Sequence, residues 1–296
     1  MKNILIIGAN GFTGRRILND LSVNPIYHVT GCSLRDDICP GKDYRFVRTD
    51  IRDENEVRKL FKECRLDIVI NTSALSVPDY CETHHAEAEA TNVTAVETIA
   101  HVCEQYGSRF IHLSTDFVFD GKSTRLYKEE DEAIPVNYYG VTKLKAEKII
   151  ASICSNYAIV RVVVVYGKAL PGQHGNILQL VANRLRNGET IRVVSDQWRT
   201  PTFVGDISVG VEKLMFHTAN GIYHICGSEC LTIAEIAYRV ADFLKLDRSL
   251  IEPVTTEEMK EVTPRPRFSG LSIEKAKAEI GYTPRTLEEG METSLF

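Results

Sequence analysis

The chain has 296 residues, of which 44% are hydrophobic and 25% charged, and its formal net charge is -5 at pH 7. These proportions are typical of a soluble globular protein, and the negative balance gives no reason to expect nucleic-acid binding. No run is apolar enough for a membrane helix, and residues 1–3 lead straight into an apolar run, which argues against a signal peptide. We therefore expect a cytoplasmic protein with one large α/β domain, or a nucleotide-binding domain with a smaller appendage.

A strand, a glycine-rich turn and a helix are the first predicted elements. The apolar run 2–7 is followed by Gly8, Gly11 and Gly14, and then by a helix expected over residues 15–21. Glycines at this spacing allow a tight turn, let the backbone approach a pyrophosphate and let the helix pack against the strand. An ordinary glycine-rich turn is the alternative, but the clean preceding strand favours a dinucleotide site. The residues of this turn that we expect to bind the cofactor are Gly8, Asn10, Gly11, Phe12 and Gly14.

The end of the second strand, expected over residues 26–33, indicates which cofactor binds. Strands that bind NAD usually end in an acid that holds the ribose hydroxyls. Here Ser33 and Arg35 stand at the tip, and two aspartates come later, in the loop. A hydroxyl and a guanidinium suit a 2′-phosphate, unless Arg35 simply points into solvent. The sequence therefore predicts NADPH, with NADH as the alternative.

Further strands and helices alternate through the first half of the chain. Strands are expected at 44–49, 66–71, 109–113 and 158–166, with helices at 54–64 and 86–106 between them. Continuous apolar strands in such an alternation predict a doubly wound parallel (Rossmann) sheet, with the ligand at the carboxyl ends of the strands. We expect residues 1–167 to form this NAD(P)-binding domain.

The pattern changes after residue 167. A polar loop at 168–176 precedes a helix at 177–186, a short strand at 191–194 and a helix at 206–217, and prolines interrupt the rest. We expect residues 168–296 to form mainly a smaller α/β substrate-binding domain, with segments near 200–220 returning to pack on the first domain.

The eight cysteines include no C-x-x-C pair, and several lie in apolar runs. Free, buried thiols in a reducing compartment are the expectation. Cys226 and Cys230, near His224, fit no common zinc spacing, so no metal is predicted there.

Tyr139 and Lys143 are the strongest candidates for catalysis. They are four residues apart in an expected helix and so share one face. A nearby fixed positive charge lowers the pKa of a phenol from about 10, which makes a general acid near neutral pH. Thr115, after the strand at 109–113, is placed to donate a hydrogen bond to the substrate carbonyl oxygen that Tyr139 would protonate. The alternatives are a chance Tyr-x-x-x-Lys spacing and a threonine that only caps the strand end.

Taken together, these motifs resemble the extended short-chain dehydrogenase/reductases, and more narrowly the dTDP-4-dehydrorhamnose reductases. The narrower resemblance rests on four runs in the family's order, at 114–121, 137–147, 196–202 and 265–269. The first and third separate the family from sugar epimerases.

The resemblance implies that NADPH or NADH delivers hydride to C4 of a 4-keto-6-deoxyhexose linked to a nucleotide diphosphate. It makes Tyr139 the proton donor, has Lys143 hold the nicotinamide ribose and lower the pKa of Tyr139, and has Thr115 orient the carbonyl. Further residues implied at the cofactor are Asp50, Ile51, Thr72, Ser73 and Ala74. Those implied at the sugar nucleotide are Asp116, Val164, Trp198, Arg199 and Arg265.

Two positions depart from the family pattern. Val164 stands where the family commonly has a tryptophan against the substrate, and Trp198, the only tryptophan, either fills that space or packs structurally. Arg15 stands where some members have a metal-binding glutamate, so no metal is expected. A nucleotide sugar is the expected partner, and a homodimer the candidate assembly. The alternatives are an epimerase or dehydratase, in which Asp116 is the extra acid, and a non-catalytic subunit like the regulatory subunit of methionine adenosyltransferase.

Overall fold

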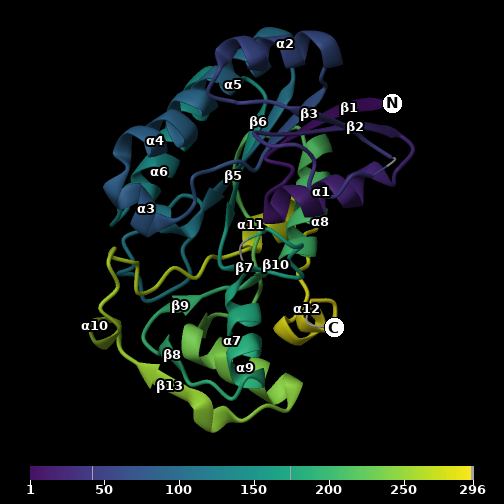
Figure 1. The fold of residues 1–296 in the computed structure, drawn as a ribbon. Helices are drawn as coiled ribbons and strands as arrows, with labels where there is room; N and C mark the ends of the chain where they lie inside the picture. Colours follow the sequence, from purple (N-terminus) through teal and green to yellow (C-terminus); the bar gives the residue numbers. More distant parts are fainter. Residues whose placement is uncertain (42, 174, 295–296) are drawn as a thin grey trace.

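A seven-stranded parallel sheet forms the centre of the protein. The computed structural model describes residues 1–41, 43–173 and 175–294, and Figure 1 shows the sheet in its upper half. The strand order is β11-β6-β5-β4-β1-β2-β3, and each pair of neighbours is parallel. The strands are β1 (Lys2–Ile7), β2 (Tyr27–Ser33), β3 (Arg45–Arg48), β4 (Ile68–Asn71), β5 (Arg109–Thr115), β6 (Tyr157–Val162) and β11 (Gly221–His224). The predicted doubly wound fold is confirmed, and the strand order reverses between β1 and β4, where such folds bind ligands.

Helices cover both faces of this sheet, as Figure 1 shows. Alternate side chains of β1 point to opposite faces of the sheet. Ile4 and Ile6 belong to one buried cluster, and Leu5 and Ile7 belong to another. The first cluster includes residues of α1 (Phe12–Ser22), α8 (Val204–Phe216) and α11 (Glu274–Ile280). The second includes residues of α2 (Glu54–Cys64), α5 (Ala95–Tyr106) and α6 (Tyr138–Ile153).

A second, smaller part of the protein lies below the sheet in Figure 1 and has its own core. There β8 (Ile191–Val194) pairs with β13 (Ile251–Val254), and α7 (Ile177–Arg186) packs with α9 (Ile233–Leu244). The chain returns to the sheet through α8, which packs on α1, and through β11, which lies beyond the predicted range of 200–220. The remaining elements are α3 (Pro78–Thr83), α4 (His85–Glu89), η1 (Ala90–Thr94), η2 (Asp116–Val118), β7 (Val165–Tyr166), β9 (Trp198–Arg199), β10 (Thr202–Phe203), β12 (Leu231–Thr232), η3 (Arg248–Leu250), α10 (Thr256–Met259) and α12 (Leu287–Glu292).

The predicted strand at 158–166 is wrong at its centre. It is two strands, β6 and β7, because Val164 has a φ of 37° and so leaves the extended conformation. Such a φ is a genuine outlier for a β-branched residue and costs roughly 1–3 kcal/mol. Thr202 supports the break, since its hydroxyl donates to the carbonyl of Val163 (2.6 Å) and its N–H to that of Val164 (3.2 Å).

Two other predictions need correction. Helix α1 begins at Phe12 rather than at residue 15, because Gly11 is its extended N-cap. Cys39 is exposed and two more cysteines, Cys64 and Cys230, are only partly buried, although all eight thiols are free. Among the described residues, no helix has both the length and the apolar character needed to cross a membrane.

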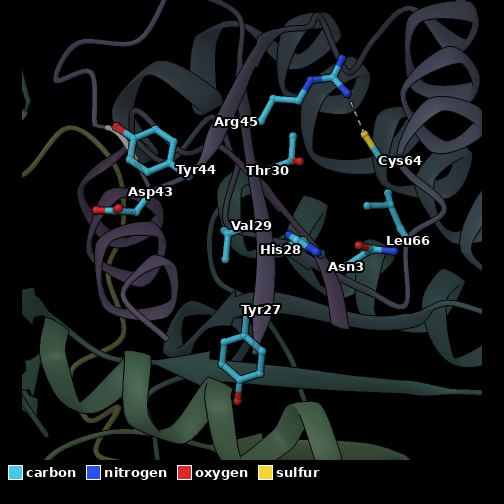
Figure 2. A pocket seen from close by; sticks show the side chains of 10 residues that line it. All are labelled: Asn3, Tyr27, His28, Val29, Thr30, Asp43, Tyr44, Arg45, Cys64 and Leu66. Atoms are coloured by element: carbon cyan, nitrogen blue, oxygen red, sulfur yellow. Dashed lines mark hydrogen bonds between the residues drawn. The ribbon is translucent and has the colours of Figure 1, made fainter. Parts of the chain in front are cut away.

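A hollow of about 420 Å³ lies at the edge of the sheet where the strands begin. Figure 2 shows side chains from the start of β1, β2 and β3 around it, including Asn3, Tyr27 and Arg45. The predicted catalytic residues lie at or beyond the carboxyl end of β5, at the opposite edge, so this hollow is no part of the candidate site.

Candidate active site

The start of α6 places Tyr139 against the end of β5. The Asn137 side chain caps the helix by accepting the N–H of Gly140 (2.9 Å). Gly140 is required by close approach, since a Cβ there would lie 2.2 Å from the carbonyl oxygen of Phe117. This contact lets the helix reach η2, where the Tyr139 side chain hydrogen-bonds with Thr115. Two of the predicted catalytic residues are therefore brought together.

The pKa of Tyr139 is raised in the protein alone, which contradicts the prediction that Lys143 lowers it. Burial is the largest cause of the higher pKa, and the charge of Asp116 adds to it, while the hydrogen bond with Thr115 opposes both. The phenol is therefore held as a protonated acid, which is the form that a proton donor needs.

Lys143 is buried on the same helix, but its ammonium group is turned to the strand. Nζ lies 2.6 Å from the carbonyl oxygen of Leu113 and 2.8 Å from Nε2 of His112. Burial lowers the pKa of Lys143 to about 8, against the opposing charge of Glu147. Nζ thus points to the strand, and Lys143 is not among the groups that set the pKa of Tyr139.

Asp116 belongs to a buried polar cluster that joins β5 to the later part of the chain. One carboxylate oxygen accepts the Ser269 hydroxyl and lies 3.7 Å from Nε of Arg199; the other accepts the Thr115 hydroxyl at 3.1 Å. Burial raises the pKa of Asp116, and the charge of Arg199 and the two hydroxyl bonds oppose the rise. The hydroxyl proton of Thr115 is thus directed to Asp116 in the protein alone.

The glycine turn and the predicted segment 72–74 meet at the carboxyl ends of β1 and β4. Gly8 has a φ of 81°, and a Cβ on Gly14 would lie 2.3 Å from the Gly8 carbonyl oxygen, so the helix start rests on the turn. Thr72 donates its hydroxyl to the Ile7 carbonyl at 2.8 Å, and Ser73 bonds to Asn71 through both its N–H and its hydroxyl.

Beyond the tip of β2, the structure shows a network that sequence reasoning missed. Arg35 is exposed, and no hydrogen bond or ion pair of its side chain is found within the described part of the chain. Buried Arg15 instead occupies this region, with Nη2 2.5 Å from Asp37 and 2.9 Å from the Asn10 side-chain oxygen, and with Nη1 2.8 Å from the Tyr44 hydroxyl. Burial is the largest single influence on the pKa of Asp37 and acts to raise it. Hydrogen bonds from the Cys39 N–H, Arg15 and Tyr44 together outweigh burial, so the pKa of Asp37 is lowered.

The remaining predicted residues lie at the same edge of the sheet or in the later part of the chain. Asp50 follows β3 and pairs with Arg52 at 2.7 Å, and Ile51 packs against the second core cluster. Trp198 is 39% exposed and pairs through its backbone with Phe268. Arg265 pairs with Glu261 at 3.1 Å.

Sequence reasoning also missed two buried polar residues beside α6, the helix that carries Tyr139 and Lys143. The predicted helix 86–106 contains a π-helical turn, η1, that carries Asn92. The Asn92 side chain contacts both the N–H and the carbonyl of Leu75, and the Thr142 hydroxyl, so it joins the segment after β4 to α6. π-Helical turns are frequent at functional sites. The signal for Asn92 and for His112 was a polar residue inside an apolar element.

Known proteins resemble this chain over nearly its whole length. The family model of the RmlD substrate binding domain matches residues 1–295. The probable low-salt glycan biosynthesis reductase Agl14 of Haloferax volcanii is 30% identical over 289 residues, 97% of this chain and 95% of that protein. Methionine adenosyltransferase 2 subunit beta of Xenopus laevis is 31% identical over 290 residues, 96% of this chain and 84% of that protein.

Solved structures agree with these sequence matches. The crystal structure of dTDP-4-dehydrorhamnose reductase from Bacillus anthracis in complex with NADP has a TM-score of 0.87 to this protein, at 26% identity, and the match covers 100% of this chain and 99% of that one. With the match of the family model, this likeness confirms the predicted resemblance. The chain therefore belongs to the RmlD substrate binding domain family, that is, to the dTDP-4-dehydrorhamnose reductase family of extended short-chain dehydrogenase/reductases.

Proposed function

We propose that this protein uses NADPH to reduce the C4 keto group of a nucleotide-linked 4-keto-6-deoxyhexose. The observation that carries the proposal is the meeting of Tyr139, Thr115 and buried Lys143 at one end of β5, at the same edge of the sheet as the glycine turn. The family, and a solved relative bound to NADP, support an oxidoreductase of this class. The residues after 167, which include Trp198, Arg199 and Arg265, would supply most of the sugar-nucleotide site.

In this reaction the bound nicotinamide supplies the hydride, and the side chains manage the proton. Tyr139 donates its proton to the oxygen that gains negative charge, and its raised pKa keeps that proton in place until then. Thr115 supplies a second hydrogen bond to the same oxygen once its hydroxyl turns away from Asp116.

The test is a turnover assay. Purified protein is incubated with NADPH and a panel of 4-keto nucleotide sugars, and the absorbance of the reduced nicotinamide is followed. We expect oxidation of NADPH with at least one 4-keto sugar and none with the 4-hydroxy sugars. No oxidation with any member of the panel would contradict the proposal.

A non-catalytic role is the second candidate, because the relative in Xenopus laevis is a subunit of methionine adenosyltransferase. Calorimetry with a methionine adenosyltransferase catalytic subunit would reveal it as tight binding without NADPH oxidation. A dehydratase is disfavoured by the contacts of Asp116, since both of its oxygens are already bonded.

The Arg35 side chain gives a prediction for cofactor choice. We expect Arg35→Ala to weaken NADPH by about 1.5–3 kcal/mol and to leave NADH nearly unchanged, because only NADPH carries a 2′-phosphate. Titration of both cofactors measures this. Arg45→Ala is the matched control, because Arg45 is the first residue of β3 and lies at the edge of the sheet where the strands begin. Equal losses for the two cofactors would remove Arg35 from the phosphate site and point to Arg15.

Val164 gives a prediction for substrate choice. We expect Val164→Trp to shift kcat/KM by about 1–3 kcal/mol toward dTDP-4-dehydrorhamnose over bulkier 4-keto sugars, because the larger ring fills the space that valine leaves. Val164→Ala is the control and should not produce this shift. If Trp198 already fills the space, Val164→Trp should instead do harm by crowding, and Trp198→Ala should raise KM. A wild-type enzyme that already selects dTDP-4-dehydrorhamnose strongly and ignores Trp198→Ala would contradict both versions.

A further inference from the structure

His112 is a fully buried imidazole between two strands and the catalytic helix, and the proposed reaction gives it no role. It lies opposite Asn71 in the pairing of β5 with β4. Its Nδ1 is 3.2 Å from the Asn71 amide nitrogen, and its Nε2 is 2.8 Å from Nζ of Lys143. The imidazole therefore connects the segment after β4 to the lysine of the active site.

The orientation of the Asn71 amide is fixed by Ser73. The Asn71 oxygen accepts the Ser73 backbone N–H at 3.0 Å and the Ser73 hydroxyl at 2.6 Å. A backbone N–H only donates, so the atom that faces it must be the oxygen, and the NH₂ group must face His112. An amide nitrogen also only donates, and Nδ1 of His112 must therefore accept. A neutral imidazole then carries its proton on Nε2.

This tautomer aims an N–H at Lys143. An ammonium group has three donors and no lone pair, whereas a neutral amine can accept the Nε2 proton. We propose that His112 is a positioning residue that favours the uncharged amine of Lys143 and holds it against β5 in the protein without ligands, through a tautomer set by Asn71 and Ser73. This contact acts together with burial, so that Lys143 loses its charge at a lower pH than a free lysine does.

The other groups that face Lys143 fit this proposal. Glu147, on the same helix, favours the ammonium, but Arg161 of β6 already pairs with it at 2.6 Å. The charge of Asp116 acts on the Tyr139 phenol, and burial raises the pKa of Cys81 to about 11, so that thiol is uncharged near neutral pH. Burial holds the pKa of His112 well below its usual value, so the imidazole stays neutral.

Nuclear magnetic resonance of the protein with ¹⁵N-labelled histidine tests the tautomer directly, and this arm does not depend on turnover. We expect His112, identified by the signal lost in His112→Gln, to show the Nε2–H pattern. In Asn71→Asp the carboxylate keeps one oxygen for Ser73 and offers the other to Nδ1, so the pattern should change to Nδ1–H. An Nδ1–H pattern in the wild type would overturn the proposal.

The pH profile of kcat/KM tests the effect on Lys143, and this arm rests on the proposed reduction. Asn71→Asp turns Nε2 into an acceptor for the ammonium. The pH at which kcat/KM falls on the alkaline side should therefore rise by about one unit. Where the wild type has lost most of its activity, the normalised rate of the variant should then be up to tenfold higher. Asn156→Asp makes the same change beside Arg109, at the opposite edge of the sheet, and should leave the profile unmoved.

His112→Gln provides an independent arm should Asn71→Asp fold poorly. A glutamine amide can turn its oxygen to the ammonium, so its high-pH limb should also move up. A limb that stays at the wild-type pH in His112→Gln, with Asn71→Asp also unmoved or unfolded, would overturn the proposal. A protein with the Nε2–H pattern and no turnover would instead refute the proposed function and leave the tautomer standing.

Discussion

Tyr139→Phe is expected to lower kcat by about a hundred- to ten-thousand-fold, the usual contribution of a positioned general acid. The substitution removes the hydroxyl that donates the proton and keeps the ring, which packs edge-on against Phe117 with centroids 6.0 Å apart. Lys143 is held by the strand rather than by the phenol, so it should stay in place. Steady-state kinetics, together with NADPH titration, measures the change, and NADPH binding should be nearly intact.

The neighbouring tyrosine offers a matched control. The Tyr138 hydroxyl donates to Glu89 at 2.9 Å, away from Thr115, and its ring stacks on His85. Tyr138→Phe should therefore change activity little, because the hydroxyl that it removes bonds to Glu89 and not to Thr115. If Tyr139→Phe kept more than about a tenth of wild-type activity, its loss would be too small for a general acid.

The parts of the fold that could be predicted from the sequence depend on local patterns. The alternation of strands and helices can be recognised from patterns in consecutive residues. The predicted helix 54–64 has the same bounds as α2 in the structure. Asp53 caps this helix, and acidic residues follow in its first turn. The doubly wound sheet follows from that alternation by general rules of connection. The break at Val164 cannot be predicted from the sequence, because a run of valines favours a strand. The hydrogen bonds at the break come from Thr202, which lies far along the chain.

In the candidate site, too, local spacing could be predicted from the sequence, whereas contacts between elements could not. The spacing of Tyr139 and Lys143 could be read from the chain, but the direction in which Lys143 turns depends on His112 and Leu113, which belong to another element. The expected effect of Lys143 on the pKa of Tyr139 failed for this reason. Likewise, the sequence does not indicate the pairing of Arg15 with Asp37, because Asp37 lies 22 residues away in a loop.

Arg161→Met is expected to lower the free energy of unfolding by about 3–5 kcal/mol, since it leaves a buried carboxylate without its partner. Arg161 and Glu147 are 2% and 3% exposed, and the guanidinium binds both carboxylate oxygens, at 3.0 and 2.6 Å. The arginine also lies over the ring of Phe119, 5.0 Å from its centroid. Denaturant titration of the variant measures the loss.

A second change separates the unpaired charge from lost packing. In Glu147→Gln combined with Arg161→Met no charge remains, and the amide oxygen still accepts the Ser114 hydroxyl, which the carboxylate accepts at 2.5 Å. The double variant should therefore be more stable than Arg161→Met alone, because removing both charges costs less than stranding one. Arg58→Met, which breaks an exposed pair with Glu54 on α2, should cost only about 0.3–0.5 kcal/mol. If the double variant were no more stable than Arg161→Met, the loss would come from the packing of Arg161 against Phe119 rather than from the stranded carboxylate.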